Sequence, residues 1–279
     1  MKNKYTYMTL LGSDNYLKGT LALIKSLELQ NTKYPITVLV TDNVSDRVKS
    51  VLDHKHINYI IADKVNISDN VRQRNIKSGF TNWSNTFSKL LIFGMTQFDK
   101  IVFLDSDMMV LKNLDHLFRK PHLSAVVAGK TYPGNEEWKD LNSGIMVIVP
   151  KEEEDKKLIN SLENLPLKNG FGDQDVLQAY YPSWKKDKSL HLEEEYNVFA
   201  KYEPYFLSTY PEKEIKVLHF VGKVKPWNMS KKQEYIYKLK VVKDQLKNNH
   251  SLKESIVSLT DFNKYKSLCK LVFSSKTKN

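Results

Sequence analysis

Short apolar runs alternate with amphipathic segments along most of this chain. A strand that is covered on both faces needs apolar residues at successive positions, so runs of this length and composition predict buried strands. Seven runs qualify: Tyr5–Leu11, Ile36–Thr41, Ile57–Ile61, Ile101–Leu104, Ala125–Ala128, Ile145–Val149 and Val217–Val221.

Helical periodicity fills several of the gaps between these runs. One helical face is formed by Tyr16, Thr20, Leu23, Ile24 and Leu27. Ser13 or Asp14 could cap the start of that helix, and further amphipathic patterns open at Ser45, at Ser84 and after Pro150. Strands that alternate with helices predict an α/β fold with a mainly parallel central sheet.

Residues 231–279 differ from the rest of the chain, because they are Lys-rich and helical in pattern, with little strand signal. A chain of 279 residues, 41% of them hydrophobic, can bury one core and carry a small appendage. We therefore expect a main domain over residues 1–230. A helical C-terminal extension over residues 231–279 should pack on it and fray at Ser274–Asn279.

Two carboxylates interrupt the most apolar part of the sequence. Asp105 and Asp107 flank Ser106 directly after the run Ile101–Leu104. Ionised carboxylates near a core need compensation, and residues i and i+2 of an extended chain point to the same side. Oxygen ligands of this kind suit Mg²⁺ or Mn²⁺, so the pair predicts a cation site at the carboxyl end of a strand.

Other polar residues lie next to predicted strands. Gly12 and Ser13 follow the first run, where free amide groups at a helix start favour a phosphate or another polar ligand atom, although ordinary turn chemistry explains them equally well. The expected turn Asn142-Ser143-Gly144 precedes another strand and could hold ligand hydroxyls. Asp173 and Gln174 open a predicted helix, where an acidic residue can also be a simple cap.

The run Val217–Val221 delivers a histidine, His219, and is followed by Gly222 and Lys225. Neutral imidazole is a competent ligand for Mn²⁺, and lysines can bind phosphate as point charges. His219 could therefore complete the site of the two aspartates, although a lone histidine in a strand is more often an ordinary core residue.

Composition indicates which binding partners and which cellular compartment to expect. The net charge is +11, but the lysines are spread along the chain without a nucleic-acid-binding signature, so a solvated surface explains them better than a nucleic-acid partner. The single Cys269 lies among apolar residues, which favours packing and a reducing compartment. No secretory signal or membrane span is recognisable, so we expect a cytoplasmic protein without a membrane partner.

Several motifs, in order, resemble the glycogenin and galactinol synthase branch of glycosyltransferase family 8. The resemblance covers about residues 5–230. It is carried by Thr9-Leu10 through Tyr16-Leu17-Lys18-Gly19, Ser88-Lys89-Leu90, Phe103-Leu104-Asp105-Ser106-Asp107, Asn142-Ser143-Gly144, Gly172-Asp173-Gln174, and His219-Phe220 through Lys225-Pro226-Trp227-Asn228.

This resemblance implies a GT-A-like, Rossmann-type domain that binds a UDP-sugar with Mn²⁺, or alternatively Mg²⁺, and transfers a hexose with retention of configuration. Uracil and ribose would be bordered by Leu10, Gly12, Ser13 and Tyr16. The metal site would consist of Asp105, Ser106, Asp107 and His219, with the two aspartates and the histidine as ligands, and the diphosphate would be held by Gly222 and Lys225. The donor sugar would be surrounded by Lys89, Asn142, Ser143, Asp173 and Gln174. Asp173, with Lys89 and Gln174, would carry catalysis.

The chain departs from glycogenin in places that concern the acceptor. Gly170 stands where glycogenin has another Asp, and Phe171 replaces a small residue. The segment of glycogenin's own acceptor tyrosine corresponds to residues 196–205, and its connection to His219 is shorter here. Tyr202 or Tyr205 would be the candidates for self-glucosylation. UDP-glucose is the first candidate donor, with a glycan, a tyrosine or a small polyol as acceptor, and a homodimer is an open alternative.

Other readings remain open at this stage. A galactinol synthase-like enzyme would act on a separate acceptor. A haloacid-dehalogenase-type phosphatase also uses Asp-x-Asp, but usually on its first strand. A non-enzymatic sugar-nucleotide-binding protein would not need the full set of Asp105, Asp107, His219 and Lys225.

Overall fold

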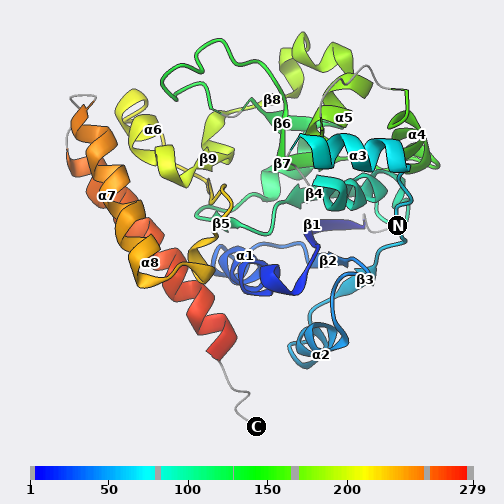
Figure 1. Ribbon diagram of the computed structural model, residues 1–279, viewed down its shortest axis with the longest axis horizontal. Coiled ribbons are helices and arrows are strands. Elements are labelled where there is room, and N and C mark those ends of the chain that lie inside the picture. The colour runs from blue at the N-terminus through cyan, green and yellow to red at the C-terminus, as the bar shows by residue number, and fades with distance from the viewer. Residues whose placement is uncertain (1–3, 79–82, 128, 165–169, 248–251, 275–279) are drawn as a thin grey trace.

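The computed structural model describes residues 4–78, 83–127, 129–164, 170–247 and 252–274 (Figure 1). Its centre is a seven-stranded sheet with the order β3-β2-β1-β4-β7-β6-β8. The strands are β1 (Tyr5–Leu11), β2 (Ile36–Val40), β3 (Tyr59–Ile61), β4 (Lys100–Leu104), β6 (Ser124–Val126), β7 (Asn142–Ile148) and β8 (His191–Leu192).

The sheet is mostly parallel, as the alternation of strands and helices predicts. Strands β3, β2, β1 and β4 are mutually parallel, whereas β7 runs antiparallel to both β4 and β6. Asn142, Ser143 and Gly144 are the first residues of β7, so the turn expected there is wrong. A register irregularity between Ala125 and Val126 interrupts the pairing of β6 with this strand.

Both faces of the sheet are buried. Neighbouring residues of β1 enter different cores, because Met8 packs with Phe87 and Phe171 on one face while Tyr7 packs with Leu23 on the other. This alternation follows from the two-residue period of a strand, and it explains why Lys100 is the only charged residue of β1 and β4.

Helices lie on both faces of this sheet (Figure 1). The α-helices of the described residues are α1 (Leu17–Leu29), α2 (Asp46–His54), α3 (Asp69–Lys77), α4 (Glu154–Ser161), α5 (Asp173–Tyr180), α6 (Glu203–Thr209), α7 (Lys231–Lys247) and α8 (Leu252–Ser274). Short 3₁₀ segments are η1 (Asp14–Tyr16), η2 (Trp83–Gly94), η3 (Asp115–Arg119), η4 (Pro182–Lys185), η5 (Lys188–Leu190), η6 (Glu194–Tyr196), η7 (Ala200–Tyr202) and η8 (Pro226–Asn228).

Helix starts follow the sequence signals in part. Ser45 caps α2, since its hydroxyl accepts a hydrogen bond from the Val48 amide. Ser13 precedes η1 without a side-chain cap, and the Asp14 carboxylate accepts hydrogen bonds from the amide and hydroxyl of Ser45 instead. The helix expected from Ser84 is a 3₁₀ helix, η2, rather than an α-helix.

A second, three-stranded sheet lies beside the first, with the order β5-β10-β9. It contains β5 (Met108–Val110), β9 (Val198–Phe199) and β10 (Val217–His219). The sequence patterns predicted β10 but placed it in one common sheet, and they did not predict β5, β8 or β9. The two-residue strands β8 and β9 are too short to show a period of their own.

Helices α7 and α8 lie side by side along one edge of the molecule (Figure 1). Helix α8 packs on α1 and α6, and α7 begins at Lys231, where the sequence predicts the C-terminal extension to begin. Part of the predicted frayed end, residues 275–279, lies outside the described residues. Among the described residues, no helix combines the length and apolar character needed to span a bilayer.

Candidate active site

The two aspartates of the apolar run lie in a tight turn between β4 and β5. Ser106 and Asp107 leave the extended conformation, and the Met108 amide donates to the Asp105 carbonyl at 3.2 Å. The expectation that extended backbone aims both carboxylates to one side is therefore wrong. The turn brings them together instead, and the Asp105 amide is held by the Gly144 carbonyl of β7 at 2.8 Å.

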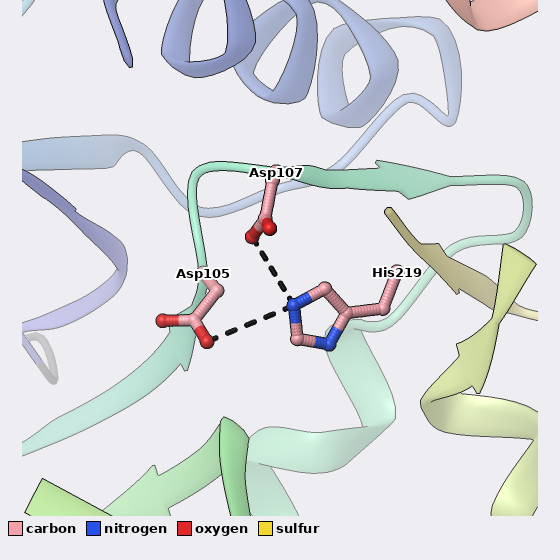
Figure 2. Close-up of side chains that lie close together, drawn as sticks. All are labelled: Asp105, Asp107 and His219. Atoms are coloured by element: carbon pink, nitrogen blue, oxygen red, sulfur yellow. Dashed lines mark hydrogen bonds and ion pairs between the residues drawn. The ribbon is translucent and has the colours of Figure 1, made fainter. Parts of the chain in front are cut away.

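The second sheet brings His219 to this turn. In the antiparallel pairing of β10 with β5, His219 is opposite Met108, and the Phe220 amide donates to the Asp107 carbonyl at 2.9 Å. Figure 2 shows the result: His219 Nε2 lies 3.1 Å from Asp107 Oδ1 and 3.8 Å from Asp105 Oδ2. Residues 112 positions apart thus meet through backbone pairing.

Each carboxylate uses its other oxygen for a lysine. Lys89 Nζ lies 3.0 Å from Asp105 Oδ1, and Lys225 Nζ lies 2.5 Å from Asp107 Oδ2. Asp105 Oδ2 and Asp107 Oδ1 consequently face His219 Nε2. Asp105, Asp107 and His219 each offer one ligand atom, and these three atoms lie within 4.8 Å of one another.

The pKa values of the two carboxyls shift in opposite directions. Burial raises the pKa of Asp105, and Lys89 and His219 offset this only in part. Burial also acts on Asp107, but the nearby His219 and Lys225 outweigh it and hold the pKa of that carboxyl well below its ordinary value. Burial alone would lower the pKa of Lys89 and Lys225, yet the carboxylates around them raise it, so both lysines are held as cations.

Lys89 also connects the aspartate turn to Asp173, which opens α5. Lys89 Nζ is 2.8 Å from Asp173 Oδ2 and 3.3 Å from both oxygens of Ser143. Gly172 is the N-cap of α5 and its amide is bound by Asp175, so Asp173 is the first residue of the helix and not its cap. Asp173 is 6% exposed and belongs to the same charged cluster as Asp105.

The neighbouring Gln174 turns toward β7. Its Oε1 accepts a hydrogen bond from the Ser143 amide at 3.3 Å. Asn142 Oδ1, at the start of the same strand, accepts from the Gly144 amide at 2.9 Å. The predicted sugar-side residues Lys89, Ser143, Asp173 and Gln174 therefore form one connected group.

The backbone before Asp173 is fixed by Asn75, a fully buried residue that the sequence did not single out. Asn75 accepts from the Phe171 amide at 2.7 Å and donates to the Phe171 carbonyl at 3.0 Å. A Cβ at Gly170 would come within 2.9 Å of the Asn75 α-carbon. The absence of an aspartate at Gly170 thus has a steric reason, and Phe171 fills the core against Phe87.

The residues predicted to border a nucleotide lie after β1. Gly12 and Ser13 follow the strand, and the Thr41 hydroxyl ties β2 to the Gly12 carbonyl at 3.2 Å. Tyr16 lies toward the charged cluster, with Lys225 Nζ 5.8 Å from its ring centre. Leu10, at the end of β1, packs at the margin of the core.

A cleft of about 410 Å³ opens beside this strand end. It is lined by Thr41, Asp42, Asn43, Asp63, Lys64, Val65, Ile67, Arg72, Ile76 and Ser88. Only Ser88 belongs to a motif recognised in the sequence. Asp42, Asn43 and Asp63 follow strands β2 and β3, and the rule that parallel strands bring their carboxyl ends to one edge could have found them.

The segment after β10 packs against η1 and the start of α1. Gly222 has φ of +125°, a value that glycine adopts without strain. The Trp227 indole donates to the Asn15 carbonyl at 2.8 Å, and its ring lies so close to Gly19 that a Cβ there would be 2.4 Å away. These contacts explain why Lys225 is held beside Asp107 rather than exposed.

The two candidate acceptor tyrosines differ in environment. Tyr202 is half-buried and stacks on Tyr132 at a centroid distance of 4.3 Å. Tyr132 packs on Phe199, whose ring meets His219 edge-on at 5.5 Å, so an aromatic path leads from Tyr202 to the charged cluster. Tyr205 is only 7% exposed and packs in α6.

The donor set fits a hard divalent cation. Two carboxylate oxygens and one imidazole nitrogen are suitable ligands for Mn²⁺ or Mg²⁺. With a neutral imidazole, the three carboxylates of Asp105, Asp107 and Asp173 exceed the two ammonium groups of Lys89 and Lys225 by one negative charge. A bound divalent cation would make the net charge of this group positive and so favour the binding of a diphosphate.

Solved structures with this architecture are glycosyltransferases. The galactosyltransferase LgtC, in complex with donor and acceptor sugar analogs, matches with a TM-score of 0.58 and 14% identity over 98% of each chain. The apo form of GlyE from Streptococcus pneumoniae matches with a TM-score of 0.55 and 22% identity, over 95% of this chain and 64% of that chain. The fold is therefore that of the GT-A class of glycosyltransferases.

Sequence similarity narrows the class. The family model of glycosyl transferase family 8 matches residues 8–231, and the chain belongs to this family. Glycogenin-1 of Homo sapiens is 34% identical over 86% of this chain and 65% of its own length, and that of Caenorhabditis elegans is 33% identical over 80% and 51%. The chain thus spans about half to two thirds of the length of these relatives.

Proposed function

We propose that this glycosyltransferase uses a UDP-sugar, with UDP-glucose as the first candidate, and transfers the hexose with retention of configuration in a Mn²⁺-dependent reaction. The observation that carries the proposal is the convergence of Asp105 Oδ2, Asp107 Oδ1 and His219 Nε2, each held from behind by a lysine or an amide. The proposal also rests on the resemblance to glycogenin.

The residues have separate tasks in this proposal. A bound cation would supply Lewis-acid stabilisation of the charge that develops on the diphosphate leaving group. Lys225, from the opposite side of Asp107, would bind a phosphate oxygen. Gly222 leaves room for the diphosphate beside the backbone, and the cleft lined by Asp42, Asn43 and Asp63 would receive the nucleoside.

Asp173 would act on the sugar. As the glycosidic bond breaks, positive charge grows on the anomeric carbon, and a nearby carboxylate stabilises it. Lys89 orients Asp173 and Asp105 together, because it bridges the two carboxylates. Gln174, Asn142 and Ser143 would hold the hydroxyl groups of the hexose.

The acceptor can be a tyrosine of this protein or a separate molecule. Tyr202 is favoured over Tyr205 for self-glucosylation, because Tyr202 is half-buried whereas Tyr205 is only 7% exposed. A separate glycan or polyol, as in a galactinol synthase-like enzyme, is the alternative, since Tyr202 is already half-buried in a stack. Neither a nucleic acid nor a membrane is required.

The test measures UDP affinity by calorimetry and the mass of the protein after incubation with UDP-glucose and Mn²⁺. Asp107→Ala should abolish Mn²⁺-dependent UDP binding, because it removes a ligand and the partner of Lys225. Asp46→Ala, which removes a carboxylate 96% exposed on α2, serves as the matched control and should bind as the wild type does.

Unchanged UDP affinity of Asp107→Ala with Mn²⁺ present would refute the metal site. In the wild type, mass gains of one hexose unit would indicate self-glucosylation. UDP release that occurs without such a gain and depends on an added sugar would indicate a separate acceptor.

A further inference from the structure

A chain of hydrogen bonds reaches His219 from the side opposite the carboxylates. His219 Nδ1 lies 2.9 Å from Asn197 Oδ1, and Asn197 Nδ2 donates to Asn142 Oδ1 at 2.7 Å. The Gly144 amide donates to the same Asn142 oxygen at 2.9 Å. Asn197 is fully buried, so its side-chain amide has no alternative partner in bulk water.

The direction of every hydrogen bond in this chain follows from one backbone group. The Gly144 amide can only donate, so the Asn142 atom that it meets must be the oxygen. The Asn197 atom that meets this oxygen must be the nitrogen, which directs the Asn197 oxygen toward His219. An oxygen of this kind can only accept, so His219 Nδ1 must carry a hydrogen.

We infer that Asn197 is a positioning residue for the cation site, and that Asn142 and Gly144 fix its orientation. With a hydrogen held on Nδ1, the ring presents Nε2 to Asp105 and Asp107, and Nε2 is the nitrogen that can give its lone pair to a cation. The inference rests on the proposed metal site, and it assigns Asn142 a task besides the sugar contact predicted from the sequence.

Gly144, Asn142 and the His219 ring are closely packed. A Cβ at Gly144 would lie 2.8 Å from Asn142 Oδ1 and 2.9 Å from His219 Cε1. Glycine at position 144 therefore allows the amide, the asparagine and the imidazole ring to pack together. The Phe199 ring meets the same imidazole edge-on and restricts its rotation.

The test combines nitrogen NMR of the His219 ring with calorimetry of Mn²⁺ binding. In the wild type, Nδ1 should carry its hydrogen both without metal and with diamagnetic Mg²⁺. Asn197→Leu removes the acceptor at similar volume, so the ring should lose this preference and Mn²⁺ affinity should fall about 10- to 100-fold. A purely structural role for Asn197 would leave the ring hydrogens where they are.

Variants of Asn142 keep the test decisive if Asn197→Leu does not fold. Asn142→Asp retains an oxygen for Gly144 and Asn197, so it should preserve the Nδ1 hydrogen, whereas Asn142→Leu should not. A bare Nδ1 in the wild type, or equal Mn²⁺ affinity of wild type and Asn197→Leu, would overturn the inference. Failure of the wild type to bind Mn²⁺ or Mg²⁺ would instead refute the proposed function, and the metal-free spectrum would still test the hydrogen-bond chain.

Discussion

At the scale of single residues, identical side chains two positions apart have opposite properties. Asp107 contacts both His219 and Lys225, which lower its pKa, whereas Asp105 faces Lys89 and lies farther from His219, so burial dominates and raises its pKa. The residue type is readable in the sequence, but its protonation behaviour depends on distant partners, and His219 and Lys225 lie more than 100 positions away from Asp107.

Asp173→Asn is the sharpest substitution at this scale. The amide keeps the shape of the side chain but removes the charge that would stabilise the developing oxocarbenium ion, and it weakens the pairing with Lys89. Sugar transfer should fall at least about 100-fold, while UDP affinity in Mn²⁺ stays near that of the wild type. Steady-state transfer rates and UDP calorimetry check both parts, and near-normal turnover would remove Asp173 from the catalytic group.

At the scale of elements, short strands and helix starts position the chemistry. The three residues of β10 pair with β5 and thereby fix His219 beside Asp107. Helix α5 begins with Asp173, while Asp175 provides the cap and leaves the Asp173 carboxylate free to pair with Lys89. At the start of α5, the residue that binds the backbone amide therefore differs from the residue that is predicted to act on the sugar.

His122, between η3 and β6, gives this scale a pH-dependent prediction. Burial lowers its pKa to about 4, with a further contribution from Lys151, and the Val149 amide donates to its Nδ1 at 3.1 Å. The unfolded chain takes up this proton near the ordinary pKa of 6.5 and the folded protein only near 4. Folding stability should therefore rise with pH across this window by up to about 3 kcal/mol and be insensitive to His122 above it.

Urea denaturation of wild type and His122→Gln between about pH 4 and pH 8 measures this contribution. The glutamine oxygen can still accept from Val149 but does not titrate, so the rise should be smaller in the variant. Equal slopes in the two proteins would show that His122 is not the group responsible.

At the scale of the whole molecule, the C-terminal helices support the site. Tyr265 of α8 is fully buried and stacks on Phe220, with ring centres 3.9 Å apart and planes within 4°. Phe220 directly follows His219, and the same tyrosine meets Trp227 edge-on at 6.1 Å. Helix α8 thus packs, through Tyr265, against the segment that carries His219 and Lys225.

Tyr265→Ala tests this support. Loss of a buried aromatic ring should cost about 3–5 kcal/mol of the free energy of unfolding, and the loosened Phe220 should also weaken Mn²⁺ binding. Tyr265→Phe keeps both ring contacts and is the matched control, expected to retain Mn²⁺ affinity. Chemical denaturation and Mn²⁺ calorimetry provide the two readouts; unaltered metal affinity in a folded Tyr265→Ala protein would contradict the coupling.

Many features of the fold and of the site follow from local patterns in the sequence. The buried strands β1, β2 and β4 are recognisable as apolar runs, because both faces of the sheet are covered. The motifs around Asp105, Asp173 and His219 indicate the family. Local spacing also predicts the helix that Ser45 caps. These features depend on neighbours in the chain, which the sequence displays directly.

The assembly of the site depends on long-range contacts that form only when the chain folds. Strand β9 is too short to show a period, and β5 directly follows the Asp105–Asp107 turn in one apolar stretch of the sequence, yet the pairing of both with β10 brings His219 to Asp107. Asn197 and Asn75 carry no local signal, because their partners lie 22 or more positions away and become neighbours only after folding. The role of a buried polar group depends on its hydrogen-bond partners, and the packing of the sheets brings these partners together from distant parts of the chain.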